Sequence, residues 1–343
     1  MSKIKIGLVG LGRLGMTHAT NIATNIPEMD LVAICSLNQD ELTTAQALLN
    51  VKETYLDYQE MLASPNLDAI VIVSPSGFHC QQIQLALEAG LHVFCEKPIG
   101  LSLSEIDQTL ALSEKHPEQK LMIGFMRRFD DSYQYAKELV AAGELGELTV
   151  IRCYGIDPSS GMESFVKFAA DSNSGGIFAD MAIHDIDLIR WFSQQEVSRV
   201  WALGKNAAYP ELDQVNELET GTAMMQLTDQ TMALLVTGRN AAHGYHVETE
   251  IIGTKGMLRI GAAPEKNLVT LFNEHGVVRP TSQNFPERFG QAFVSEMKAF
   301  ATCILDDLPT PVSARDGLQA TKIATACQTS FETNSIVEID RSN

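Results

Sequence analysis

The sequence predicts an α/β protein of two domains: a doubly wound domain with a parallel sheet, then an α+β domain with a large, mostly antiparallel sheet. Its 343 residues exceed what one hydrophobic core usually supports. Over the first 125 residues, short apolar runs alternate with segments of helical periodicity. Beyond them, runs rich in β-branched residues follow one another with few helices between. We therefore expect domains at residues 1–125 and 126–343.

The first domain is predicted from buried strands that helices separate. The apolar run at residues 4–9 ends in glycines, as a strand buried on both faces does, and Pro27 ends the helix that follows. Strands and helices that alternate at this pitch form a parallel sheet with right-handed crossovers. The expected strands cover residues 4–9, 31–35, 69–73, 92–95 and 121–124, and the expected helices cover residues 14–26, 41–49, 58–62, 79–89 and 104–114.

The second domain is predicted to begin with a helix over residues 133–142, which Gly143 closes. Turn residues such as those at 228–230 then separate one β-rich run from the next. One long helix is expected over residues 177–192. The other expected elements are strands over residues 148–154, 197–203, 221–227, 231–237, 247–252, 257–260 and 268–272, and helices over residues 289–305 and 314–329.

Charge and composition exclude several classes of protein. The formal net charge is −18, whereas a face that binds nucleic acid is basic. The same charge disfavours anionic membrane surfaces, and no apolar run approaches the ~18–20 residues that span a bilayer. The six cysteines are scattered without the spacing of a zinc site, which is typical of reduced thiols. We expect a cytoplasmic protein with neither a nucleic-acid nor a membrane partner.

A glycine-rich loop predicts a dinucleotide site. Residues 10–15 read G-x-G-x-x-G directly after the first strand and open the first helix, which is the context that gives this motif its meaning. The first glycine allows the tight turn, the second lets the backbone approach a pyrophosphate, and the third lets the helix pack on the strand. The N-terminus of the helix supplies N–H groups and a positive dipole end for the phosphates.

The end of the second strand leaves the choice of cofactor open. An NAD site usually carries Asp or Glu there for the adenosine ribose, but this chain has Ser36, and its first acidic residue follows at Asp40. Ser36 could hydrogen-bond either the ribose hydroxyls or a 2′-phosphate, and Arg13 could pair with such a phosphate. The sequence favours NAD, with NADP or dual use as the alternative.

Two further motifs carry chemistry. Lys97 lies between Glu96 and Pro98 at the carboxyl end of a strand, where open α/β sheets bind ligands, and the Lys97–Pro98 bond is a candidate cis peptide. Asp180 and His184 are four residues apart on the expected long helix and would share one face of it. A carboxylate beside an imidazole supports a general base. With Asp187, they could instead ligate a metal, but no Cys or His cluster joins them, so no metal is expected.

These motifs, with the stretch GFMRRFD at residues 124–130 and Gly175-Gly176 before Asp180, resemble the Gfo/Idh/MocA oxidoreductase family over essentially the whole chain. Within that family, the chain is most similar to the inositol 2-dehydrogenases. The resemblance implies a Rossmann domain followed by a substrate-binding and oligomerisation domain, with NAD as cofactor. It also implies oxidation of a ring hydroxyl of a cyclic polyol such as inositol to the ketone, an inosose, and a homo-oligomer, commonly a tetramer, formed through the open face of the second sheet.

The resemblance also implies roles for individual residues. Lys97 would join the proton relay at the substrate hydroxyl, and His184 would act as the base with Asp180 as its partner. Gly155 and Asp157 stand where some inositol dehydrogenases carry His and Asn, which leaves the preferred isomer open. The implied substrate contacts are Lys97, Arg127, Asp157, Asp180, His184 and Tyr245. The implied cofactor contacts are Gly10, Leu11, Gly12, Arg13, Leu14, Gly15, Ser36, Ser74, Pro75, His79, Glu96 and Lys97.

Alternatives to this function come from several classes. The chain could be a dehydrogenase of another sugar or polyol, with NADP as cofactor. It could be a regulator of the same fold that senses NAD(P) without turnover, although a sensor has no need of Lys97, Asp180 and His184 together. A simple sugar-binding module is hard to reconcile with the glycine loop.

Overall fold

The computed structural model describes residues 3–171, 174–262, 265–274 and 276–340. The chain divides into two compact units. Unit 1 consists of Met1–Phe129 with Gln291–Thr321, and unit 2 consists of Asp130–Gly290 with Lys322–Asn343. The sequence predicted one boundary near residue 125, whereas a later segment also belongs to unit 1. Long-range packing explains this difference, because the Ile123 N–H donates to the Val312 carbonyl.

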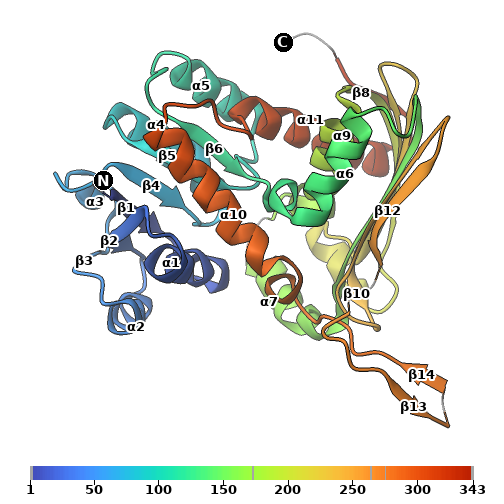
Figure 1. The fold of residues 1–343 in the computed structure, drawn as a ribbon, viewed down its shortest axis with the longest axis horizontal. Coiled ribbons are helices and arrows are strands. Elements are labelled where there is room, and N and C mark those ends of the chain that lie inside the picture. The colour runs from blue at the N-terminus through green and yellow to red at the C-terminus, as the bar shows by residue number, and fades with distance from the viewer. Residues whose placement is uncertain (1–2, 172–173, 263–264, 275, 341–343) are drawn as a thin grey trace. The chain divides into compact units, whose positions relative to one another are not determined.

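Unit 1 is a six-stranded parallel sheet with strand order β3-β2-β1-β4-β5-β6, and helices lie against it (Figure 1). Strand β4 is buried at all four positions, as expected of a parallel strand covered on both faces. The strands are β1 Ile4–Val9, β2 Met29–Cys35, β3 Glu53–Tyr55, β4 Ala69–Ile72, β5 His92–Glu96 and β6 Leu121–Gly124. The helices are α1 Arg13–Asn25, α2 Gln39–Leu49, α3 Tyr58–Leu62, α4 His79–Glu88 and α5 Leu103–Ser113, with 3₁₀ turns η1 Ser76–Phe78 and η2 Met126–Phe129.

The predicted doubly wound class is confirmed. The strand order turns back at β1, so β1 and β4 form the switch point at which open α/β sheets bind their ligands. The sequence missed β3, which has only three residues and therefore shows no clear periodicity. Two later helices contribute to both units: α10 Phe285–Leu305 and α11 Ala314–Thr333.

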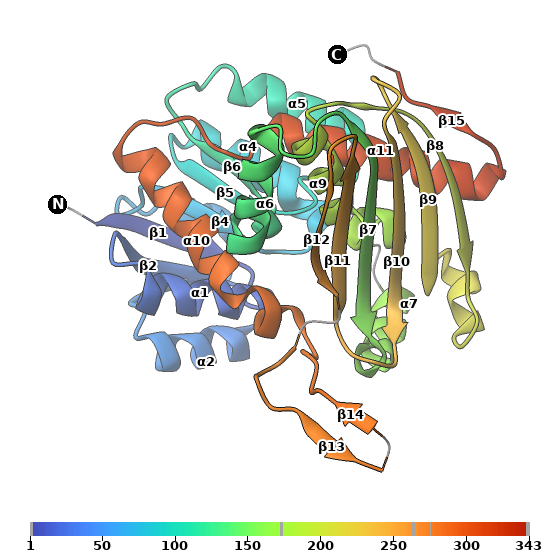
Figure 2. The ribbon, with the colours of Figure 1, turned by 45° about the vertical axis from the view of Figure 1, so that its right-hand side comes forward.

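Unit 2 is built on a seven-stranded sheet with order β12-β11-β7-β10-β9-β8-β15. The β7–β10 pair is parallel and the others are antiparallel, which confirms the predicted class. Helices α6 and α9 lie on one face of this sheet (Figure 2). The strands are β7 Leu148–Pro158, β8 Val197–Lys205, β9 Thr220–Leu227, β10 Met232–Ala241, β11 His246–Gly253, β12 Met257–Ala262 and β15 Val337–Glu338. The helices are α6 Asp131–Ala141, α7 Met162–Asp171, α8 Gly176–Asp180 and α9 Ile183–Ser193, with 3₁₀ turns η3 Ser159–Gly161 and η4 Pro210–Val215.

The single helix predicted over residues 177–192 is wrong. The segment forms α8 and α9, with a break at Met181 and Ala182, both of whose N–H groups donate to the Ile177 carbonyl. Apolar residues on both sides of the break are buried, among them Phe178 and Ile186. Packing of both short helices therefore sets the turn, and apolar periodicity alone cannot distinguish such a pair from one continuous helix.

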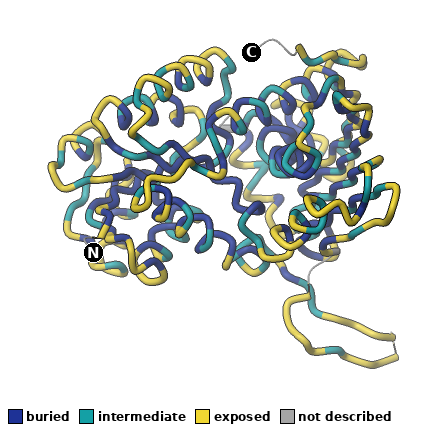
Figure 3. The backbone as a smooth tube through the Cα atoms, turned by 45° about the horizontal axis from the view of Figure 1, so that its top comes forward, coloured by how far each residue is buried: buried dark blue, intermediate teal, exposed yellow. Residues whose placement is uncertain are grey.

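A short hairpin extends from unit 2. Its strands, β13 Leu271–Asn273 and β14 Gly276–Val278, are exposed at every position (Figure 3). The sequence predicted a strand over residues 268–272, whereas β13 covers only Leu271–Asn273 and pairs with β14 alone in a two-stranded sheet. Leu268 is 98% exposed and Phe272 is 75% exposed, which is unusual for large apolar side chains.

Candidate functional site

The glycine loop joins β1 to α1 and has the geometry of a phosphate cradle. Gly10 has a φ of 93°, and a Cβ there would lie 2.5 Å from the Val73 carbonyl oxygen. A Cβ on Gly15 would lie 1.9 Å from the Gly10 oxygen, so this glycine lets α1 pack on the strand. A Cβ on Gly12, by contrast, would meet nothing within 4 Å, and Arg13 beside it is exposed. The loop is therefore closely packed at Gly10 and Gly15 and has open space at Gly12. This arrangement fits a pyrophosphate at the N-terminus of α1.

A carboxylate that was not predicted from the sequence lies near the end of β2. The Ser36 Oγ donates a 2.6 Å hydrogen bond to Glu41 Oε2, and the Asn38 N–H donates to Ser36 Oγ. Glu41 lies five residues further on, in the first turn of α2. A search for an acid directly after the strand therefore could not find it, although its place in the first turn of a helix near the ribose position is a usable signal.

The loop after β4 is tied to the turn after β5 through a buried imidazole. His79 Nε2 lies 2.8 Å from the Ser74 carbonyl oxygen, and Nδ1 lies 2.7 Å from the Pro98 carbonyl oxygen. Burial lowers the pKa of His79, while hydrogen bonds to these two carbonyls oppose that shift. Ser74 is half-buried and Pro75 is exposed. Ser74 and Pro75, which were predicted to line the cofactor, therefore reach solvent. His79, which was predicted with them, is buried and hydrogen-bonds to the backbone of their loop.

The turn after β5 contains Lys97, which is half-buried, and the Lys97–Pro98 bond is cis, as the sequence suggested. Glu96 is buried: its Oε1 is hydrogen-bonded to His18 Nε2 at 2.7 Å, and its Oε2 accepts the Lys97 N–H at 3.1 Å. Glu96 thus holds the backbone of the turn after β5 from inside. Arg127, on the 3₁₀ turn after β6, is also buried.

The carboxyl ends of parallel strands meet at one edge of a sheet. The glycine loop, Ser36, Ser74, Lys97 and Arg127 each follow one of the strands β1, β2, β4, β5 and β6 in unit 1. This edge thus gathers predicted cofactor residues from distant parts of the chain, together with Arg127, which was predicted to bind substrate. It is where a dinucleotide binds in a doubly wound fold.

In unit 2, Asp180 is held by an arginine that the sequence analysis did not single out. Arg239 Nη1 donates to Asp180 Oδ2 at 2.8 Å, and the guanidinium carbon lies 3.7 Å from the centroid of the Phe165 ring. Asp180 ends α8 and His184 lies in the first turn of α9, so the predicted shared face of one helix is wrong. Both side chains are half-buried. The sequence offered one signal for this contact: Arg239 is a charged residue within a strand that is otherwise mostly apolar.

The other two residues predicted to bind substrate lie on different elements of unit 2. Asp157 is half-buried near the end of β7. Tyr245 is buried just before β11, where its N–H donates to the Ser282 carbonyl and its ring packs edge-on against Phe289. Asp187, considered with Asp180 and His184 for a metal, is buried in α9.

Two other sequence expectations bear on the kind of protein. All six cysteines are buried thiols. Within the ranges described, no helix has the length and apolarity needed to cross a membrane.

Among described residues, three side chains of the types that bind metals converge at a place the sequence did not indicate. His18, Glu96 and Glu296 offer atoms that all lie within 4.8 Å of one another.

The fold and the edge of unit 1 define a dinucleotide-binding α/β protein with a separate second unit. Residues 4–125 match the family model described as "Oxidoreductase family, NAD-binding Rossmann fold", and residues 133–259 match the "GFO/IDH/MocA C-terminal domain". The chain belongs to the Gfo/Idh/MocA oxidoreductase family. It is a dehydrogenase whose cofactor is NAD, and the glycine loop fits that cofactor.

The chain is similar over nearly its whole length to several inositol dehydrogenases. The chain is 60% identical to scyllo-inositol dehydrogenase from Lactobacillus casei with bound NAD(H) and scyllo-inositol; the TM-score is 0.96, and the match covers 98% of this chain and 99% of that one. It is 46% identical to myo-inositol 2-dehydrogenase from Lactobacillus plantarum, with a TM-score of 0.97 and coverage of 99% and 100%. It is 30% identical to the myo-inositol 2-dehydrogenase of Thermotoga maritima, over 98% of this chain and 99% of the relative.

Proposed function

We propose that the protein is an NAD-dependent inositol 2-dehydrogenase that oxidises a ring hydroxyl of inositol to the ketone, with release of a proton. The observation that carries the proposal is the 60% identity, over nearly the whole of both chains, to an enzyme with bound NAD(H) and scyllo-inositol. When bound, NAD accepts the hydride from the ring carbon. We expect scyllo-inositol to be a better substrate than myo-inositol, because identity to the myo-inositol enzyme is lower, at 46%.

The proposed roles follow the predicted residues. His184 takes the proton of the substrate hydroxyl, and Asp180 supports the charged imidazole. Arg239 supports this proposal because it fixes the Asp180 carboxylate at 2.8 Å. Lys97 joins the proton relay, and the buried Glu96 fixes its backbone. Arg127, Asp157 and Tyr245 are proposed to hold the other hydroxyls of the ring.

The test is a substrate panel with both pyridine nucleotides. Purified protein is incubated with scyllo-inositol, myo-inositol, glucose or another aldose, each with NAD or NADP, and reduction is followed by absorbance. We expect NADH formation with an inositol and little with the aldoses. Reduction only with an aldose would identify a different sugar dehydrogenase. NAD binding without turnover on any substrate would favour the regulatory alternative.

We propose further that Glu41 supplies the acid that selects NAD over NADP. Its carboxylate accepts a hydrogen bond from the Ser36 hydroxyl at the end of β2. An acidic group at this position usually binds the adenosine ribose diol. A 2′-phosphate at this position would face a negative charge. The serine therefore does not by itself indicate NADP, because the hydrogen bond brings the missing carboxylate to the same place.

Glu41→Gln tests this selection, since the amide keeps the shape of the side chain and removes its charge. We expect the ratio of kcat/KM for NAD to that for NADP to fall about tenfold, the value of one charge-assisted hydrogen bond. Asp40→Asn is the matched control, because Asp40 is exposed and precedes Glu41 in the same turn. An unchanged ratio in Glu41→Gln would assign the selection to other residues.

We also propose a homo-oligomer, a tetramer, in the cytoplasm. Support for self-association comes from two apolar surfaces of unit 2. One is the open face of the large sheet, defined by the exposed residues Trp201, Leu203, Met224 and Met232. The other is the β13–β14 hairpin with Leu268 and Phe272. Surfaces of this kind mark protein–protein contacts, and the six buried thiols support a reducing compartment.

A further inference from the structure

A buried glutamate of unit 1, Glu296, has none of the roles assigned above. Glu296 is on α10, and its side chain is fully buried. Neither of its carboxyl oxygens has a hydrogen-bond partner among the described residues. A buried polar group without a partner costs free energy, and a buried unpaired charge costs much more. A glutamate persists at such a position only if something in its surroundings compensates.

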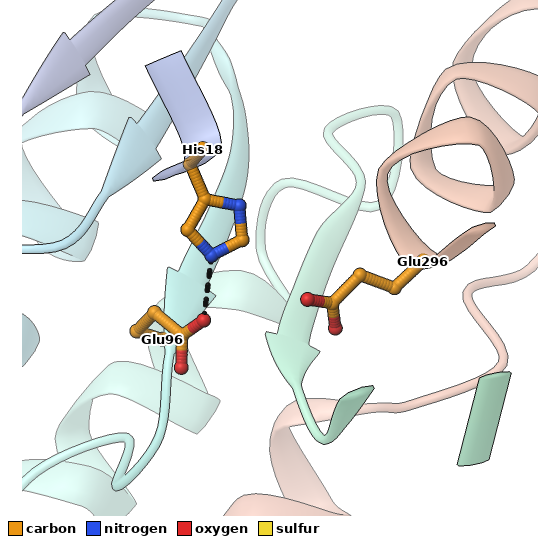
Figure 4. Close-up of side chains that lie close together, drawn as sticks. All are labelled: His18, Glu96 and Glu296. Carbon is orange, nitrogen blue, oxygen red and sulfur yellow. Dashed lines mark hydrogen bonds and ion pairs between the residues drawn. The ribbon is translucent and has the colours of Figure 1, made fainter. Parts of the chain in front are cut away.

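What faces Glu296 is the His18–Glu96 pair. Figure 4 shows its carboxyl group pointing toward the pair, which comes from α1 and β5. The ligand-type atoms of the three side chains lie within 4.8 Å of one another. The surroundings are apolar, because the His18 ring packs against Phe94 and Phe293, with ring centroids 5.5 Å apart in each pair.

The charges in this pocket restrict the ionisation of Glu296. Burial raises the pKa of Glu296 well above the ordinary value of 4.5, and the charge of Glu96 raises it further. Among the described residues, His18 from α1 and Glu96 from β5 face it. Besides the effect of burial, the charge of Glu96 raises the pKa of His79 on α4, and the charge of Lys97 lowers it. Two ionised carboxylates side by side in apolar surroundings would repel strongly.

We propose that Glu296 is a positioning residue that carries a proton in the folded enzyme and, as a neutral hydrogen-bond donor, steadies the His18–Glu96 pair directly or through one water molecule. A proton on Glu296 removes its repulsion with the carboxyl group of Glu96. Its Oε1 stays on His18, and its Oε2 stays on the Lys97 N–H. The effect on catalysis is indirect, through the backbone of the turn that carries Lys97.

A metal ion is the competing explanation, since one histidine and two glutamates are typical ligands. The 2.7 Å contact between His18 Nε2 and Glu96 Oε1 argues against it. This contact is a direct hydrogen bond, and a cation held by both atoms would take its place. A proton between these groups needs no such rearrangement.

The role of Glu296 in turnover rests on the proposed inositol dehydrogenase activity, so the first measurement does not use turnover. Urea unfolding of wild-type and Glu296→Gln protein is followed from about pH 6 to about pH 9. The folded state holds a proton that the unfolded chain releases at these pH values. Wild-type stability must therefore fall as the pH rises, relative to the variant, which cannot ionise. Glu88→Gln, an exposed glutamate of α4, should follow the wild-type profile.

Two further readouts complete the test. The infrared band of a protonated carboxyl group should be present in the wild type and in Glu88→Gln and absent from Glu296→Gln. In turnover, Glu296→Gln should keep kcat/KM within about twofold as the isosteric donor. Glu296→Leu, which removes the donor, should lose about tenfold, mostly in kcat, because the turn with Lys97 shifts.

Three outcomes would overturn the proposal. The first is a Glu296→Gln variant less stable than the wild type by the same margin at every pH, or unable to fold, which would indicate an ionised and paired Glu296. The second is a stoichiometric metal in the purified wild type that Glu296→Gln loses. The third is an unchanged kcat in Glu296→Leu with the expected unfolding profile, which would leave the proton in place but remove the positioning role.

Discussion

The two sheets of this protein expose different parts of their strands. In unit 1, β4 is buried along its whole length, and the loop after β1 contains the exposed Gly12. In unit 2, β8 alternates between buried and exposed residues, and Trp201 and Leu203 face outward. A parallel sheet covered on both sides offers its strand ends for binding, whereas a sheet covered on one side also offers a face. The proposed cofactor residues therefore lie at the strand ends of unit 1, whereas the proposed association surface lies on a face of the sheet of unit 2.

The largest expected effect tests whether both units carry chemistry. Lys97→Ala changes unit 1 and His184→Ala changes unit 2. Each should lower kcat by at least ~10²–10⁴-fold, the usual contribution of a positioned proton-transfer group, and leave NAD affinity nearly intact. Steady-state kinetics and NAD titration measure both quantities. If one variant kept wild-type turnover on the best substrate, chemistry would be confined to the other unit.

A smaller effect separates two glycines of the same loop. Gly15→Ala places a methyl group where no space exists, 1.9 Å from the Gly10 oxygen, and should cost about 1–3 kcal/mol of stability. Gly12→Ala meets nothing within 4 Å, so the protein should stay stable while NAD binds about tenfold more weakly because the pyrophosphate loses close backbone approach. Thermal unfolding and NAD titration distinguish them. Equal NAD affinity in Gly12→Ala and wild type would place the phosphates elsewhere.

The smallest effect on turnover is expected at the open face. The pair Trp201 and Met224 lies directly across neighbouring strands, with both side chains exposed. Replacing both by Lys should dissociate the proposed oligomer and change kcat by less than about twofold, since neither residue belongs to the proposed site. Light scattering coupled to gel filtration reports the mass. A variant that keeps the wild-type mass would move the interface to the hairpin, which Phe272→Ser then tests.

Local pattern was sufficient for much of this molecule. The glycine loop and all five expected parallel strands were predicted to within two residues, because burial on both faces leaves a continuous apolar run, and Lys97 follows its strand as expected. The strand expected over residues 31–35 begins earlier, at Met29, which changes nothing at its functional end. Residues such as Glu41 were missed because the hydrogen bond that matters joins a strand end to a helix.

The sequence by itself determined the order of elements and the chemistry of the motifs, since both depend on neighbours along the chain. Tertiary structure decided the break between α8 and α9, the grip of Arg239 on Asp180 and the convergence of Glu296 on the His18–Glu96 pair. His18 and Glu96 are 78 residues apart, and Arg239 and Asp180 are 59 apart. Such contacts form only when the packed core brings distant segments together, and no periodicity within a short window encodes them.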